Sequence, residues 1–245
     1  GRINVIAVDP NDSNIIYIGS PSGGLWKTLD EGANWTPLTD NQPVLGVSAI
    51  AINPNNTDVL YIGTGDKDSG DNYSIGVLKS LDGGNSWNTT GLDWTINQNR
   101  TIAKLIINSN NTDILYAATT SGLYRTTDAG VSWFKVLSGD IDDLEFKPGN
   151  PNVVYAIAPR KFYKSTDGGD TFVETTGVPT SGRAQIAVTD DNPYYVYYFS
   201  SNNGIYRSED SGDSFTKMSS QPNQGSQAWY DLAFCVSDMD ANEVH

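Results

Sequence analysis

The chain of 245 residues carries 29 acidic and 15 basic side chains, giving a formal net charge of −14 at pH 7. This acidic excess disfavours nucleic acid and anionic membrane surfaces as partners, because both would repel the protein. Cys235 is the single cysteine and His245 the single histidine, which excludes an internal disulfide, a multi-histidine metal site and histidine-based catalysis within this segment. No apolar stretch reaches bilayer-spanning length and no signal peptide is present, so we expect the soluble part of a longer protein.

Short apolar runs separated by turn residues follow one another along the chain. Residues 3–8 and 15–19 flank a turn at 9–12 and predict a hairpin, to which residues 24–28 add a third strand. The same order predicts strands at 47–52, 59–63 and 77–79, at 102–107, 114–118 and 123–125, at 144–146, 153–157 and 162–164, and at 186–188, 194–199 and 205–207. A sixth set begins at 230–236 and 243–245. Because many of these runs lack strict alternation, we expect strands buried on both faces, as in stacked sheets.

An eight-residue pattern follows the third strand of each of the five complete sets. It consists of a hydroxyl residue, an Asp two places on, a Gly two places later and an aromatic residue at the eighth place. The second copy reads Ser80-Leu81-Asp82-Gly83-Gly84-Asn85-Ser86-Trp87, and the five aspartates are Asp30, Asp82, Asp128, Asp167 and Asp210. We expect a tight turn in which the Asp accepts backbone N–H bonds, the Gly takes a positive φ and the hydroxyl adds a local hydrogen bond.

The five aspartates lie 39 to 52 residues apart, a period typical of one four-stranded propeller blade. The pattern resembles the Asp-box, or BNR, repeat of sialidases, xyloglucanases and sortilin-type receptor propellers. This resemblance implies an all-β fold, a β-propeller of four-stranded antiparallel blades. Its blades are expected at about 1–44, 45–98, 99–138, 139–180 and 181–224, with part of a sixth at 225–245. We expect residues 1–245 to form a single partial propeller, a fragment of a ring of seven or eight blades.

The longest insertion within a repeat, residues 65–73, carries three carboxylates, at Asp66, Asp68 and Asp71. Oxygen ligands at this density suit Ca²⁺, the one cofactor that the sequence suggests. The spacing differs from that of an EF-hand loop, however, and acidic loops are common in acidic chains. A solvated loop held by Asx turns is therefore the preferred interpretation.

A ligand site is also predicted where inner strands begin, because these positions ring one mouth of a propeller channel. The candidates are Arg2, Arg100, Asp142, Asp143, Arg183 and Asp231, with Trp229 and Tyr230 beside the last of them. Arginine forks suit carboxylates at such a mouth. The three arginines are out of register by one residue, however, so the alternative is that they pair with neighbouring aspartates between blades. Trp94, in a connection between blades, could stack on a sugar ring or anchor a peptide, but we expect it to fill the joint between two blades.

A glycosidase is one functional interpretation of the chain. Hydrolysis of a glycosidic bond needs two carboxylates across a cleft. The resemblance to xyloglucanases implies a catalytic Asp just before the Gly-Gly of the first blade, but this chain reads Ser20-Pro21-Ser22-Gly23-Gly24 there. The Arg-Ile-Pro motif of sialidases is missing too. Asp143 and Asp231 remain a candidate pair, with further catalytic carboxylates expected partly outside this segment.

A binding module is the other interpretation, and the one we prefer. Residues 16–28 and 63–80 resemble the N-terminal propellers of large Bacteroidota surface proteins that are exported through type IX sorting domains. The resemblance implies a non-catalytic, extracellular module of a larger secreted or cell-surface protein. We expect a platform for adhesion that binds protein or carbohydrate and contacts the remainder of its own chain, with no nucleic-acid partner and no membrane insertion. A sortilin-like receptor, which would bind peptides inside the ring, is a third alternative. Such receptors carry disulfide-rich modules after the propeller, and this segment contains none.

Overall fold

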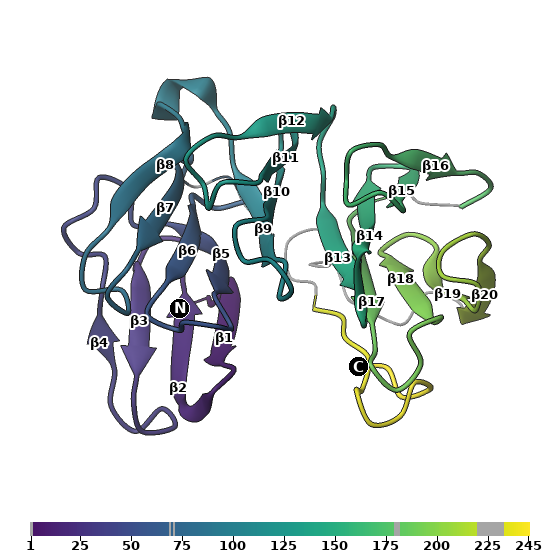
Figure 1. Ribbon diagram of the computed structural model, residues 1–245, viewed down its shortest axis with the longest axis horizontal. Coiled ribbons are helices and arrows are strands. Elements are labelled where there is room, and N and C mark those ends of the chain that lie inside the picture. The colour runs from purple at the N-terminus through teal and green to yellow at the C-terminus, as the bar shows by residue number, and fades with distance from the viewer. Residues whose placement is uncertain (1, 69, 71, 179–181, 220–232) are drawn as a thin grey trace. The chain divides into compact units, whose positions relative to one another are not determined.

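The computed structural model describes residues 2–68, 70, 72–178, 182–219 and 233–245, which form five four-stranded sheets (Figure 1). Contacts divide the chain into two compact units, residues 1–135 and 136–245, and each is described by itself. A 3-10 turn, η1 (Ile96–Gln98), interrupts the strands of the first unit. Within the described ranges, no helix has the length and apolar character that crossing a membrane requires.

The first unit holds three sheets, the last of which ends just past its boundary. The first sheet contains β1 (Val5–Asp9), β2 (Asp12–Gly19), β3 (Leu25–Thr28) and β4 (Thr36–Pro37). The second contains β5 (Val47–Ile52), β6 (Leu60–Thr64), β7 (Gly76–Ser80) and β8 (Asn88–Asp93). The third contains β9 (Ile102–Ile107), β10 (Leu115–Thr119), β11 (Gly122–Thr126) and β12 (Phe134–Leu137). In each sheet, strands consecutive in the chain are neighbours, and their described pairings are antiparallel.

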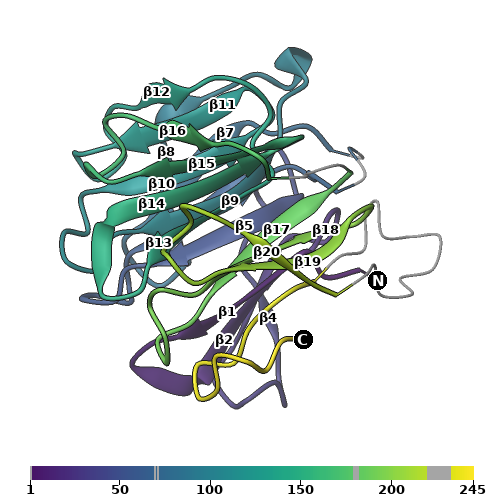
Figure 2. The same ribbon diagram turned by 90° about the vertical axis from the view of Figure 1, so that its right-hand side faces the viewer.

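The second unit holds two sheets of the same kind (Figure 2). The fourth sheet contains β13 (Asp143–Lys147), β14 (Asn150–Ala158), β15 (Lys161–Ser165) and β16 (Val173–Thr175). The fifth contains β17 (Ala184–Val188), β18 (Val196–Ser200), β19 (Gly204–Ser208) and β20 (Thr216–Ser219). An antiparallel bridge between Val236 and Val244 follows, and the predicted strand residues 230–232 lie outside the described part.

The core consists of layers between consecutive sheets. Tyr17 and Leu25 of the first sheet pack against Ile62 and Leu78 of the second, and the second packs against the third in the same way. All five residues of β6 are buried, as expected for a strand covered on both faces. Each fully buried large apolar side chain contributes about 1.5–3 kcal/mol, so these layers stabilise each unit. Trp94 is 7 % exposed and belongs to the layer between the second and third sheets, which confirms its predicted place in a joint.

The repeated turns have the predicted hydrogen bonds. In the second copy, Ser80 Oγ donates to Asp82 Oδ1 at 2.8 Å and accepts from Gly84 N at 2.9 Å. Ser86 donates two hydrogen bonds to the same carboxylate, from its N to Asp82 Oδ1 at 2.8 Å and from its Oγ to Asp82 Oδ2 at 2.6 Å. The glycine at the fifth place has φ between +77° and +95° in all five copies. These turns therefore satisfy their own polar groups locally.

One backbone feature of the turns was not predicted from the sequence. The fourth residue also adopts the left-handed region, and in three copies it is not glycine: Glu31, Ala129 and Ser211 have φ of 57°, 55° and 61°. The backbone N–H of this residue is bonded outside the turn: Ala129 N donates to Asp113 O at 2.9 Å and Glu31 N to Asn14 O at 3.1 Å. The turn is thereby tied to the start of the second strand of its own sheet.

A lysine and a tyrosine on neighbouring strands connect the second and the third turn to the preceding sheet. Tyr61 Oη and Lys79 Nζ both donate to Ala129 O at 3.0 Å, and Lys79 lies over the Tyr61 ring. Burial raises the pKa of Tyr61 to about 12, with a smaller contribution from Asp113. Tyr17 and Lys27 donate to Gly83 O in the same way, at 3.5 and 3.2 Å. Consecutive sheets in the first unit are therefore held in a repeated register by hydrogen bonds as well as by apolar contacts.

The turn carboxylates give the fold an acid sensitivity. A side-chain hydrogen bond from the residue at the seventh place lowers the pKa of Asp30, Asp82 and Asp128 to about 2, helped by the backbone N–H of that residue. An unfolded Asp titrates near about 3.9, so the unfolded state binds more protons over this range. The stabilisation is therefore present above about pH 4 and is lost as the pH falls from about 4 to about 2.

We expect the urea midpoint of the unaltered chain to fall steeply between pH 4 and pH 2. The Asp128→Asn variant should have a lower midpoint at pH 4, and this midpoint should fall less over the same range. The carboxyl carbon shift of Asp128 in an NMR titration measures its pKa directly. A titration midpoint near that of a free Asp would contradict the assignment of the turn hydrogen bonds as the cause.

Candidate functional site

The carboxylate of Asp66 is buried in the first unit and bonded to Arg2 and Asn4. The side chain of Asp66 is 0 % exposed, and its Oδ2 lies 2.6 Å from Nη2 of Arg2. Asn4 Nδ2 donates to its Oδ1 at 3.0 Å, and the backbone N of Asp68 donates to the same oxygen at 3.2 Å. A charge removed from water in this way needs such partners. Asp66 thus joins the N-terminal segment to the loop between β6 and β7.

The same loop is also tied to its neighbours on either side. Asn72 Nδ2 donates to Pro21 O at 2.8 Å and lies 3.0 Å from Ser22 Oγ. Ser74 N donates to Arg100 O at 2.8 Å. Residues 20–24, 65–68, 72–76 and 94–101 therefore form one connected surface, here called the loop surface. Tyr73 projects from it with 41 % of its area exposed.

The loop surface contains two of the three predicted calcium ligands, Asp66 and Asp68. Both oxygens of Asp66 accept hydrogen bonds from protein donors, so a cation there would have to replace Arg2. Asp71 lies outside the described residues. Among the residues that are described, no group of three or more His, Cys, Asp or Glu side chains has the geometry to hold a metal. Calcium binding at Asp66, Asp68 and Asp71 stays a prediction.

The predicted mouth residues of the first unit have structural partners. Arg2 pairs with Asp66, as the alternative interpretation of the sequence proposes. The Arg100 guanidinium lies 5.3 Å from the centre of the Trp94 ring, a cation–π contact with a buried aromatic side chain. Both arginines therefore stabilise the connections that carry the loop surface.

In the second unit, Asp143 is 5 % exposed and connects two sheets. Its Oδ1 accepts from Leu144 N at 2.9 Å and its Oδ2 from Ile186 N at 2.8 Å. The backbone of Asp142 donates to Ile157 O, and the carbonyl of Arg183 accepts from Ser201 N. Trp229, Tyr230 and Asp231 lie outside the described residues, and the convergence of these positions with Arg2 and Arg100 on one mouth stays a prediction.

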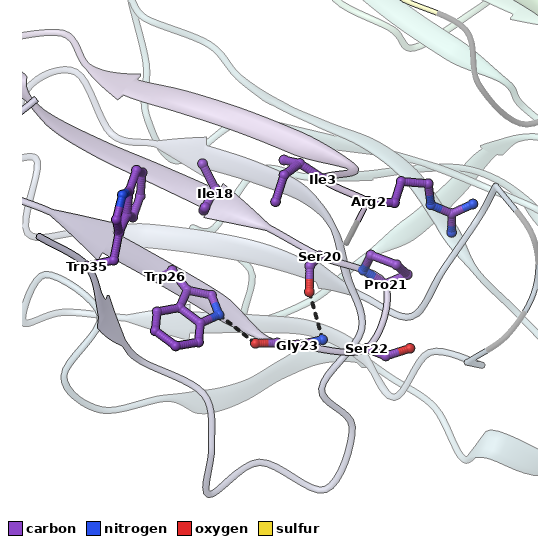
Figure 3. Close-up of a pocket in the computed structure, with 9 residues that line it drawn as sticks. All are labelled: Arg2, Ile3, Ile18, Ser20, Pro21, Ser22, Gly23, Trp26 and Trp35. Carbon is purple, nitrogen blue, oxygen red and sulfur yellow. Dashed lines mark hydrogen bonds between the residues drawn. The ribbon is translucent and has the colours of Figure 1, made fainter. Parts of the chain in front are cut away.

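A shallow hollow of about 550 Å³ lies against the first sheet, and residues 20–23 of the loop surface form part of its lining (Figure 3). It is lined by Arg2, Ile3, Ile18, Ser20, Pro21, Ser22, Gly23, Trp26 and Trp35. Trp26 Nε1 donates to Gly23 O at 2.7 Å, and Ser20 Oγ accepts from Gly23 N at 2.7 Å. Arg2 and residues 20–23 of this lining were singled out in the sequence, but the hollow itself was not predicted. Trp35, the aromatic residue at the eighth place of the first turn, was a further signal that could have indicated it.

No protein-family model matches the chain. A xyloglucanase of Paenibacillus sp is 28 % identical over 150 residues, which cover 56 % of this chain and 15 % of the relative. The GH74 enzyme of Niastella koreensis superposes with a TM-score of 0.72 at 21 % identity, over 100 % of this chain and 40 % of that one. An ancestral GH74 enzyme superposes with a TM-score of 0.76 at 21 % sequence identity, over 99 % of this chain and 34 % of that one.

The chain is a β-propeller module. Its five sheets match propeller blades of the GH74 structures, which confirms the predicted all-β fold of four-stranded antiparallel blades and its likeness to xyloglucanases. An extracellular domain of a one component system from B. thetaiotaomicron also matches, with a TM-score of 0.65 at 14 % identity, over 92 % of this chain and 29 % of that one. This module spans at most 40 % of these structures. The predicted domain limits, one partial propeller over residues 1–245, stay a prediction.

Proposed function

We propose that the module is a non-catalytic, glycan-binding platform of a larger extracellular protein, with the loop surface as its recognition site. The observation that carries this proposal is that the carboxylates expected at the loop surface are either missing or buried. Residues 20–24, where the resemblance to xyloglucanases implies a catalytic Asp, contain none. The nearby Asp66 is buried and bonded to Arg2 and Asn4. A glycosidase needs two carboxylates that reach the substrate, whereas binding needs a rigid surface.

The loop surface has the properties of a preorganised polar site. Asn72 and Ser74 fix its loops to one another through hydrogen bonds, so little conformational entropy is lost when a ligand binds. Tyr73 presents an exposed ring with a polar tip, a combination that suits contact with a sugar ring. The net charge of −14 favours a neutral ligand over an anionic one. We therefore assign the ligand to the neutral polysaccharides.

The proposal includes an extracellular location, supported by the likeness to an extracellular domain of B. thetaiotaomicron. It also includes a role in adhesion, in which the platform attaches a secreted or cell-surface protein to a glycan-bearing partner. Export through a type IX sorting domain, as in the Bacteroidota proteins that the sequence resembles, belongs to the same proposal.

Binding is tested by titrating the chain with xyloglucan, the polysaccharide named in its Paenibacillus relative, and with a neutral mannan and a β-glucan. We expect Tyr73→Ala to weaken binding of the recognised polysaccharide at least about tenfold, the effect of losing one aromatic anchor. Tyr194→Ala is the matched control, because Tyr194 is 61 % exposed but belongs to the second unit. Equal affinity of the Tyr73→Ala variant and the original chain would remove the loop surface as the site.

A glycoside hydrolase is the second candidate, favoured by the 28 % identity to a xyloglucanase. Its test is release of reducing ends from the same polysaccharides, with Asp143→Asn and Asp231→Asn as the variants. We expect no release by this chain. Release that disappears in either variant would replace the binding proposal with hydrolysis.

A further inference from the structure

Arg100 has no acidic partner in the part of the chain that the structure describes. Its guanidinium makes the cation–π contact with Trp94, but no hydrogen bond or ion pair joins it to a described residue. The chain contains 29 acidic side chains, and two other arginines, Arg2 and Arg207, each pair with a carboxylate. The five N–H groups of the Arg100 side chain are therefore available on the loop surface, to which residues 94–101 belong.

The position of Arg100 is fixed by the residues around it. Its guanidinium lies over the ring of Trp94, which is buried and meets Tyr124 edge to face. Its carbonyl oxygen accepts a hydrogen bond from Ser74 N at 2.8 Å. Asn99, directly before it, ends η1 in the left-handed conformation, with φ of 53°. Because these contacts already restrict Arg100, little of its conformational freedom is lost when a ligand binds.

Arg100 and the exposed ring of Tyr73 belong to adjacent stretches of the loop surface. Tyr73 precedes Ser74, whose backbone N donates to Arg100 O. Two polar side chains nearby are already used within the protein, because Asn72 Nδ2 donates to Pro21 O and the Ser74 side chain is buried. A sugar that packs on Tyr73 must replace the hydrogen bonds that its hydroxyl groups made to water. Arg100 supplies donors for this exchange.

We infer that Arg100 determines the specificity of the loop surface, by donating two parallel hydrogen bonds to a pair of adjacent sugar hydroxyl oxygens. The planar guanidinium presents its N–H groups as a fork, which suits two acceptors side by side. This inference rests on the proposed glycan binding and narrows the ligand to neutral polysaccharides whose units carry two adjacent free hydroxyl groups. A 1,4-linked β-glucan has such a pair on each unit, whereas a 1,3-linked β-glucan has none within its chain, because the linkage uses the hydroxyl between the other two.

The test measures binding of the full 245-residue chain to two oligosaccharides of equal length, cellohexaose with 1,4-linkages and laminarihexaose with 1,3-linkages. We expect tighter binding of cellohexaose, and Arg100→Met should weaken it at least about tenfold, the effect of losing an arginine hot spot. Arg100→Lys keeps the charge over Trp94 but lacks the fork, and it should also weaken binding. This second variant keeps the test valid if Arg100→Met does not fold.

Lys135→Met is the matched control for Arg100→Met. Lys135 Nζ lies 5.4 Å from the centre of the Tyr124 ring, so this variant also removes a cation from an aromatic side chain, but outside the loop surface. We expect it to leave the affinity for cellohexaose unchanged. An equal loss of affinity in Lys135→Met and Arg100→Met would overturn the inference, because Arg100 would then have no role of its own.

Other outcomes separate this inference from the proposed function. If Tyr73→Ala weakens binding of cellohexaose but Arg100→Met and Arg100→Lys do not, the inference is wrong and glycan binding at the loop surface stands. Equal affinity for the two oligosaccharides, with equal losses in Arg100→Met, would also overturn it. Tighter binding of an oligogalacturonate that weakens steeply with added salt would show that Arg100 serves a carboxylate instead. If no saccharide binds at all, the proposed function and the inference both fail.

Discussion

Replacing Gly76 by alanine is expected to lower the free energy of unfolding of the second blade by more than about 4 kcal/mol, or to prevent its folding. Gly76 has φ of +100°, and a Cβ there would lie 1.9 Å from Leu92 O and 2.8 Å from Leu92 C. Both atoms belong to the backbone of the paired strand β8. They cannot move without breaking the pairing of Gly76 with Asp93. The overlap therefore has no inexpensive relief.

Gly139→Ala separates the effect of overlap from the effect of backbone strain. Gly139 has a similar φ of +109°, but nothing lies within 4 Å of the position that a Cβ would take there. The Gly139→Ala variant is expected to lose about 1–2 kcal/mol of its free energy of unfolding, the usual cost of a left-handed conformation for a residue with a side chain. Urea denaturation of the two variants measures the difference. Equal losses in both would show that strain alone explains the requirement for glycine at position 76.

The sequence was sufficient to predict the repeated turns and the fold. The hydrogen bonds of each turn are local: in the second turn, Ser80 and Asp82 bond to residues no more than four positions away. The order of hydroxyl, Asp, Gly and aromatic residue therefore carries the hydrogen bonding directly. The spacing of the turns then gave the blade period, and the neighbours of known structure confirm the fold.

The candidate site was less accessible to sequence analysis, because its contacts join residues far apart in the chain. Asp66 meets a guanidinium 64 residues away, and Asp143 a backbone N–H 43 residues away. In the sequence, a buried ion pair and a calcium loop look alike, since both place carboxylates among polar residues. The environment of Trp26 also depended on the register of β3 against β2, where a shift of one residue would turn the ring to the opposite face.

Asp66→Ala is expected to lower the free energy of unfolding of the first unit by about 3 kcal/mol at pH 7, within the range for breaking a buried ion pair. The substitution removes the carboxylate oxygens to which Arg2 and Asn4 donate, in a site where the carboxylate is 0 % exposed. Because the Arg2 side chain is 23 % exposed, water can hydrate part of the freed guanidinium. The loss should therefore stay near the lower end of that range.

Three measurements distinguish this buried pair from an ordinary surface contact. Glu174→Ala removes the Lys161–Glu174 pair, whose side chains are 49 % and 42 % exposed, and should cost no more than about 1 kcal/mol. The Asp66→Ala loss should change little with added salt, because a buried pair is weakly screened. The free energy of unfolding of the Arg2→Ala, Asp66→Ala double variant should fall by less than the sum of the two single losses, since the contact between these two side chains is lost in each single variant and is counted once in the double variant. Strict additivity of Arg2→Ala and Asp66→Ala would mean that the two side chains stabilise the loop surface independently, and the ion pair would no longer explain why its loops are held together.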